Sequence, residues 1–91
     1  MKYALAYNAD VLPAMAALDP LVQEQIIDEI ENLAAGTIPL PPPRRGMPQM
    51  VHDFILQSPH AHLYVFVSLI HEQPGNLIRI IRIGWHQRSI D

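Results

Sequence analysis

An arginine and a histidine lie four residues apart near the C-terminus, in the run IIRIGWH that ends at His86. A neutral histidine serves as a general base near pH 7, and an arginine stabilises negative charge developing on a phosphate. Arg82 and His86 would therefore suit phosphodiester cleavage without a metal, with the RNA 2′-hydroxyl as the nucleophile. In the alternative interpretation, His86 only caps the C-terminal tail and Arg82 pairs with an acidic residue.

Further residues suited to nucleic-acid contacts lie in the stretch from Thr37 to Pro48, which carries five of the nine prolines. Proline is incompatible with a helix interior or a central strand, so this stretch is expected to be a stiff extended connector. A functional interpretation is that it presents Arg44 and Arg45 beside a groove, where they contact phosphates. Trp85 and Tyr64 offer rings on which bases could stack, although Trp85 equally suits an anchor for the tail or a partner.

The chain has five histidines and no cysteine. His60 and His62 are close enough in sequence to suggest a metal site. With no thiolate available and only Asp53 nearby, a closed structural zinc site has little support. We therefore expect no metal and no other cofactor, and we expect His60 and His71 to be surface turn residues.

The elements that must position these residues begin with a short alternating strand from Lys2 to Tyr7. Helical spacing then predicts a helix over Asp10 to Leu18, for which Asn8 is a suitable N-cap. An Asp-Pro pair at 19–20 starts a longer amphipathic helix that runs to about Ala35 and ends at Gly36. Because the break between the two helices is short, they should form an antiparallel hairpin.

Three further strands are expected over Met50 to Leu56, over His62 to Ile70, and from Asn76 to Gly84. The middle one should be central in the sheet, since both of its faces are largely apolar. On a regular strand, Arg79 and Arg82 would point to opposite faces. The expected fold is α+β in the order β-α-α-β-β-β, with a helical hairpin packed on a mostly antiparallel four-stranded sheet.

Length and composition predict one domain spanning residues 1–91, with 49% hydrophobic and 16% charged residues. So low a charged fraction suggests that a partner covers part of the apolar surface. The lack of cysteine, of a signal peptide and of a long apolar run favours a soluble cytoplasmic protein with no membrane association. The net charge of −3 argues against broad nonspecific nucleic-acid binding. Acidic residues dominate positions 1–40, whereas positions 41–91 are mildly basic.

The order of elements, the RGMP loop that begins at Arg45, and the ending IRIGWHQRS resemble the RelE/ParE toxin superfamily of bacterial type II toxin–antitoxin systems. The resemblance covers nearly the whole chain and is strongest from Arg45 to Ser89. The TIPLP run at residues 37–41, together with Arg82 and His86, is most similar to the YafQ-like branch of RelE-type toxins.

This resemblance implies a toxin that acts as a metal-independent, ribosome-dependent endoribonuclease, or mRNA interferase. Such enzymes cut mRNA in the ribosomal A site and leave a 2′,3′-cyclic phosphate. It also implies that His86 is the general acid/base and that Arg82 supports the phosphate. The residues expected to place the RNA are Arg44, Arg45, His62 and Arg88. The implied partners are a cognate antitoxin, the ribosome and mRNA.

Two alternatives remain, because the chain departs from RelE-type enzymes at several places. Those enzymes carry lysines on the second strand and an arginine at the turn that follows. This chain has His52 or Asp53 on the strand and Gln57 at the turn. A ParE-like toxin would have no catalytic site and would inhibit DNA gyrase by protein contact, whereas a degenerate relative would only bind an antitoxin. All three functions predict an apolar groove for an antitoxin segment.

Overall fold

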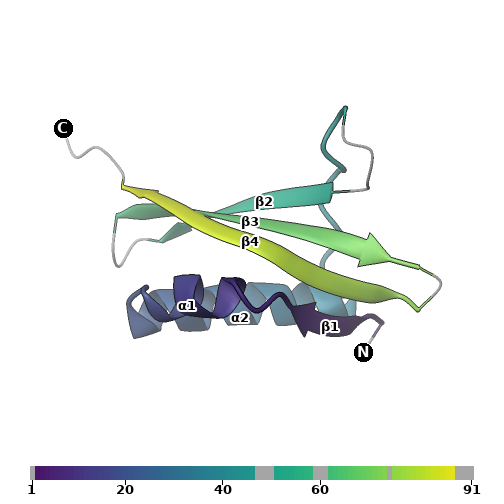
Figure 1. Ribbon diagram of the computed structural model, residues 1–91, viewed down its shortest axis with the longest axis horizontal. Helices are drawn as coiled ribbons and strands as arrows, with labels where there is room; N and C mark the ends of the chain where they lie inside the picture. Colours follow the sequence, from purple (N-terminus) through teal and green to yellow (C-terminus); the bar gives the residue numbers. More distant parts are fainter. Residues whose placement is uncertain (1, 47–50, 59–61, 74, 88–91) are drawn as a thin grey trace.

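The computed structural model describes residues 2–46, 51–58, 62–73 and 75–87. Its elements are β1 (Ala4–Tyr7), α1 (Val11–Ala16), α2 (Pro20–Ala35), β2 (Val51–Ser58), β3 (Leu63–Glu72) and β4 (Leu77–Gln87). This order confirms the α+β prediction. Figure 1 shows both helices packed on one side of the sheet, while the opposite face of the sheet carries no helix. In the part of the chain described, neither helix is long and apolar enough to cross a membrane.

The strands form one mixed sheet in the order β1-β4-β3-β2. β3 pairs antiparallel with both β2 and β4, while the short β1 pairs parallel with β4. The central position predicted for the third strand is therefore confirmed. β1 begins at Ala4 rather than at Lys2, because the backbone N–H of Tyr3 donates to the carbonyl of Ala34 at the end of α2.

Local sequence signals set the ends of α2 as predicted. The Asp19 carboxylate accepts a hydrogen bond from the backbone N–H of Leu21 at 2.9 Å, and Gly36 closes the helix in the left-handed conformation. The start of α1 differs from the prediction. Asn8 offers its backbone carbonyl, not its side chain, to the N–H of Val11, and α1 has no side-chain cap.

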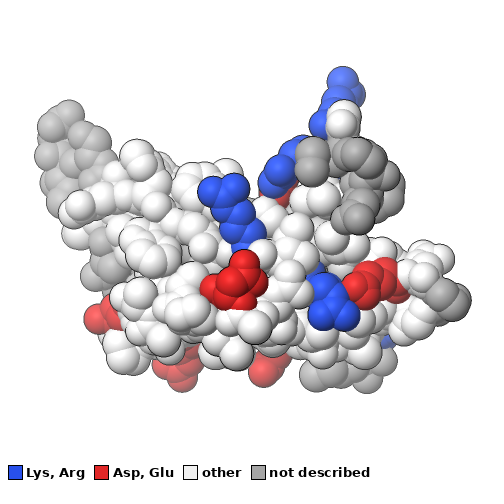
Figure 2. All heavy atoms as spheres, in the orientation of Figure 1, with Lys and Arg blue, Asp and Glu red and all other residues white. Residues whose placement is uncertain are grey.

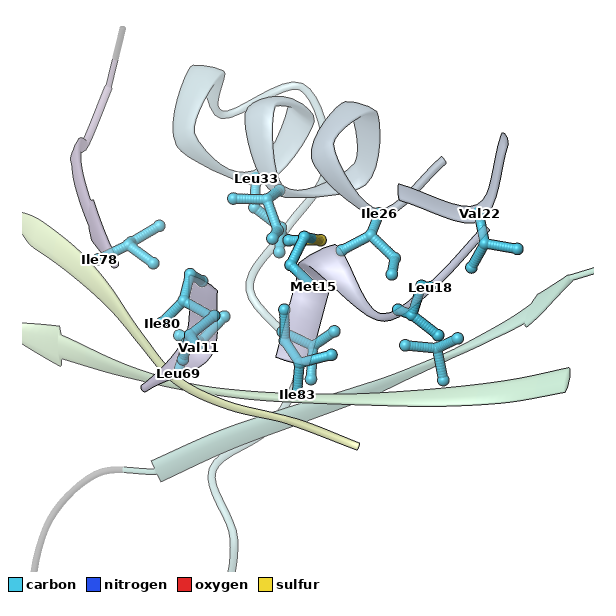
Figure 3. Close-up of a cluster of buried hydrophobic side chains, with 13 residues drawn as sticks. Val11, Met15, Leu18, Val22, Ile26, Leu33, Leu69, Ile78, Ile80 and Ile83 are labelled. Atoms are coloured by element: carbon cyan, nitrogen blue, oxygen red, sulfur yellow. The ribbon is translucent and has the colours of Figure 1, made fainter. Parts of the chain in front are cut away.

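The hydrophobic core lies between the helices and the near face of the sheet (Figure 3). α2 contributes a continuous buried stripe in which Ile26 and Ile30 are fully buried. β3 contributes Val65, Val67 and Leu69, which point to the same face because alternate strand residues do. This packing fixes one face of β3 and β4 to the core and leaves the other face of the sheet free.

β4 departs from the prediction in its length, because the strand does not end at Gly84 but continues to Gln87. Gly84 pairs with Phe66 across the ladder, and His86 pairs with Tyr64. A glycine ends a strand only where the hydrogen-bonded pairing with the neighbouring strand also ends. Here β3 is long enough to continue this pairing past Gly84. His86 is therefore a strand residue with a defined face, not a residue of the tail.

A register shift in β4 corrects a second expectation. Ile80 pairs with Leu69 and Arg82 pairs with Ser68, so Ile81 is an extra residue in β4. Such a bulge changes the alternation of side chains by one position. As a result Arg79 and Arg82 lie on the same face of the sheet, the one without helices, and the prediction of opposite faces is wrong.

Candidate functional site

Three cross-strand rows on the free face of the sheet, which the register defines, make up the candidate site. The polar row consists of Asp53, Ser68 and Arg82. The apolar row consists of Ile55, Phe66 and Gly84. The terminal row consists of Gln57, Tyr64 and His86. Successive rows are two residues apart along each strand, so the apolar row separates the arginine from the histidine.

A pocket of about 510 Å³ opens over the polar and apolar rows. It is lined by Arg44, Asp53, Phe54, Ile55, Phe66, Ser68, Arg82, Gly84 and Trp85. This volume lies in the usual range for small-molecule sites. Figure 2 shows basic side chains along the upper, sheet side of the molecule, where the surface is hollowed beside the raised connector.

Arg44 is held in the pocket wall by Asp53. Its Nε donates to Oδ2 at 2.6 Å, and its Nη2 donates to Oδ1 at 2.5 Å. The Ser68 hydroxyl donates to the same Oδ1 at 2.6 Å. The Arg44 hydrogen bond is the main reason that the pKa of Asp53 lies below its ordinary value, and it raises the pKa of Arg44. The charge of Arg44 is therefore already compensated inside the site.

The proline-rich connector is attached to the free edge of β2, and this attachment places Arg44. His52 is 93% buried, and its Nδ1–H donates to the carbonyl of Pro41 at 2.6 Å, since a carbonyl oxygen can only accept. Pro43 pairs with His52 as an antiparallel bridge, and the backbone N–H of Arg44 donates to the carbonyl of Val51. The side chain of Arg44 is thereby directed over the sheet.

Arg82 lies in the pocket with its charge uncompensated. Its side chain is exposed and has no hydrogen-bond or ion-pair partner among the residues that the structure describes. Arg79, on the same strand, differs in this respect: its Nε donates to Glu72 at 2.7 Å, and this bond lowers the pKa of Glu72. Within the described chain, the interpretation in which Arg82 pairs with an acidic residue is therefore wrong.

His86 is exposed at the far end of the same face of β4. Four strand residues place its Cα about 13 Å from that of Arg82. Only Gly84 lies between them on this face, and a Cβ added there would meet nothing within 4 Å. The open space over Gly84 is where the side chains of Arg82 and His86 can approach one group from both sides.

The other predicted site residues lie around this centre. Arg45 is exposed in the turn after Arg44 and does not line the pocket. His62 is exposed, with φ of 51°, just before β3. It precedes Leu63, which pairs with Gln87, so it lies at the same end of the sheet as His86.

Two predicted residues, Arg88 and His60, lie outside the described residues. Among the residues described, no group of three or more histidine, aspartate or glutamate side chains is arranged to hold a metal ion.

Phe66 and Ser68 were missed by the sequence analysis. Asp53 was considered there only as a residue found where RelE-type enzymes carry a lysine. The alternation of β3 already placed Phe66 and Ser68 opposite the buried valines. Their neighbours across the ladder depend on the register and on the bulge at Ile81, for which the sequence has no local signal.

No protein-family model matches this sequence, and no curated protein matches it. Solved structures of the E. coli toxin RelE are similar. A RelE mutant in the free state is 19% identical over 92% of this chain and 83% of its own, with a TM-score of 0.73. RelE in the intact E. coli RelBE toxin–antitoxin complex is 17% identical over 98% and 99%, also at 0.73. Mutant RelE with an antitoxin RelBc peptide is 18% identical over 100% and 87%, at 0.72. The chain thus has the RelE fold.

Proposed function

We propose that this protein is a RelE/ParE-superfamily toxin of a type II toxin–antitoxin system and an endoribonuclease that cleaves mRNA on the ribosome. The observation that carries the proposal is the pairing of an uncompensated Arg82 with an exposed His86 on one face of β4, on either side of Gly84. A cation and a proton acceptor facing one open space are the minimal set for metal-independent RNA cleavage.

In this proposal His86 takes the proton of a ribose 2′-hydroxyl, and the resulting oxygen attacks the adjacent phosphorus. The bond from phosphorus to the 5′-oxygen breaks, a 2′,3′-cyclic phosphate forms, and the leaving oxygen receives a proton from water, while His86 returns its proton to the solvent. Arg82 stabilises the charge that builds on the non-bridging phosphate oxygens. A positioned general base contributes about a hundredfold to ten-thousandfold to such a reaction.

The distribution of charge supports this orientation of RNA. The helical layer and the loops around it contain six acidic residues, Asp10, Asp19, Glu24, Asp28, Glu29 and Glu31, against Lys2. The described part of the sheet and connector carries four arginines against Asp53 and Glu72. Figure 2 shows the blue groups toward the sheet side. A polyanion would be repelled by the helices and attracted to the free face of the sheet.

A second candidate, a non-enzymatic ParE-like inhibitor of DNA gyrase, is favoured by one observation. Asp53 compensates Arg44 within the pocket, so Arg82 remains the one pocket arginine without a partner among the described residues. A toxin that acts through protein contact needs no further cation there. The two candidates differ in whether His86 is required.

The proposed partner in either case is a cognate antitoxin. Two of the similar RelE structures contain antitoxin, one in the intact RelBE complex and one as a RelBc peptide. This chain exposes large apolar side chains that a partner segment can cover, namely Leu12, Leu21, Ile27, Ile55, Phe66 and Trp85.

The test is expression in bacterial cells of the wild type, His86→Ala and a control, His71→Gln. His71 lies at the opposite end of β3 from the candidate site, and its Nε2 is 3.2 Å from the Asn76 side-chain oxygen. We expect the wild type and the control to stop growth and to leave cleaved mRNA. His86→Ala, shown to be folded by circular dichroism, should do neither. Toxicity that persists in His86→Ala together with DNA-damage signalling would support the gyrase candidate instead.

A further inference from the structure

We infer that the apolar row of the pocket is a nucleobase site, in which one unpaired base of single-stranded RNA stacks on Phe66. The phosphate attached to that nucleotide lies over Gly84, between Arg82 and His86. This inference rests on the proposed function, because it names the part of the RNA that enters the pocket.

The floor of the pocket offers an exposed aromatic face. The Phe66 side chain is 42% exposed and Ile55, its neighbour across the ladder, is 59% exposed. Phe66 lies on the central strand β3 and Ile55 on the edge strand β2, whereas the β3 side chains next to Phe66 on the opposite face, Val65 and Val67, are fully buried. Aromatic side chains on a sheet surface are platforms on which bases stack with little dependence on sequence.

Gly84 keeps the other side of this floor open. It pairs with Phe66 from β4, and a Cβ at its position would have no neighbour within 4 Å. The Phe66 ring is therefore not covered by a side chain from β4 in its own row. A sugar–phosphate backbone can run along β4 over Gly84 while its base projects sideways onto Phe66.

The polar row explains why the occupant is a nucleotide and not a purely apolar group. Arg82, which has no partner in the described chain, lies beside the apolar row of the pocket. Its uncompensated positive charge favours binding of an anion. On the other side of the pocket, the Asp53 carboxylate and the Arg44 guanidinium supply hydrogen-bond acceptors and donors. A pocket of about 510 Å³ is in the range that takes one small ligand. A duplex would hide the base face from Phe66.

The experiment titrates purified protein with a five-nucleotide single-stranded RNA and with the same RNA carrying an abasic central position. Anisotropy of a labelled version of each RNA gives the affinity. The variants are Phe66→Leu, which removes the ring, and Phe66→Tyr, which keeps it. Leu12→Ala on α1 is a control at an exposed apolar residue outside the pocket.

We expect Phe66→Leu to weaken binding of the intact RNA by about fivefold to a hundredfold, the usual range for one stacked base. Phe66→Tyr and Leu12→Ala should bind as the wild type does. The abasic RNA should bind wild type and Phe66→Leu equally, because an RNA that lacks the central base cannot stack on the Phe66 ring.

The inference is overturned if Phe66→Leu binds the intact RNA as tightly as the wild type, or if it loses affinity for both RNAs equally. Base-dependent binding in a protein that cleaves no mRNA would refute the proposed enzymatic function and leave the nucleobase site standing. Cleavage of mRNA by the wild type with no base-dependent binding would refute the nucleobase site and leave the proposed enzymatic function standing.

Discussion

Filling the space over Gly84 should make the protein more stable and at the same time inactive. Gly84 has an ordinary strand conformation, and nothing lies within 4 Å of the position where a Cβ would be added. A Gly84→Val substitution can therefore be accommodated without moving the backbone. The new side chain would occupy the space between Arg82 and His86 where the scissile phosphate is proposed to lie.

The expected gain in stability follows from two effects. A glycine inside a strand destabilises by roughly 0.5–1 kcal/mol relative to alanine. A β-branched residue opposite an aromatic one, here Phe66, adds roughly 0.2–1 kcal/mol as a cross-strand pair. A net gain of about 1 kcal/mol raises the melting temperature by about 4–8 °C in a domain of this size.

The expected loss of activity is larger in relative terms. Displacing a reacting phosphate by an ångström or more can reduce the rate about a hundredfold. Thermal unfolding by circular dichroism and cleavage of mRNA in a translation extract measure the two effects on the same purified protein. Gly84→Ala, with a smaller side chain, should show a smaller change in both. A Gly84→Val protein that is less stable than the wild type, or that cleaves mRNA normally, would refute this description of the site.

Three further predictions concern the scaffold and the pocket wall. Gly36→Ala should destabilise by about 1 kcal/mol, measured in urea, because φ is +79° and the new methyl group would lie 2.8 Å from the Lys2 side chain. Ile30→Ala should cost about 2–5 kcal/mol in the same assay, since Ile30 is fully buried in the core. Asp53→Asn should remove a pH-dependent part of the stability: the pKa of Asp53 is lowered by Arg44, so its contribution is present above the unfolded-state pKa near 4 and is lost as the pH falls below it. The stability difference between wild type and Asp53→Asn should therefore shrink as the pH falls from about 5 through the lowered folded-state pKa of Asp53.

Local sequence signals predicted much of the fold. Asp19 followed by proline, and Gly36 at the other end, determine the limits of α2 through backbone geometry that depends on neighbouring residues alone. The two apolar faces of β3 likewise predicted its central position. The ends of β4 were predicted less well, because a glycine such as Gly84 remains in a strand when a long partner strand continues the ladder.

The composition of the site depended on contacts that no local pattern encodes. The bulge at Ile81 brings Arg82 onto the face opposite the helices and in line with Ser68. The pairing of Arg44 with Asp53 depends on how the connector follows β2, which the buried hydrogen bond from His52 secures. Sequence predicted an arginine beside a groove, but it did not predict that a carboxylate would already hold that arginine.

The central claim is that His86 cleaves mRNA on the ribosome, and one measurement addresses it directly. Purified wild type and His86→Ala are each added to a bacterial translation extract, and the ends of a defined mRNA are mapped, with the same mRNA free of ribosomes as a control. We predict cuts with 2′,3′-cyclic phosphate ends by the wild type on translated mRNA alone, and no cuts by a folded His86→Ala. Equal cutting by both proteins, or an intact mRNA in every reaction, would contradict the claim.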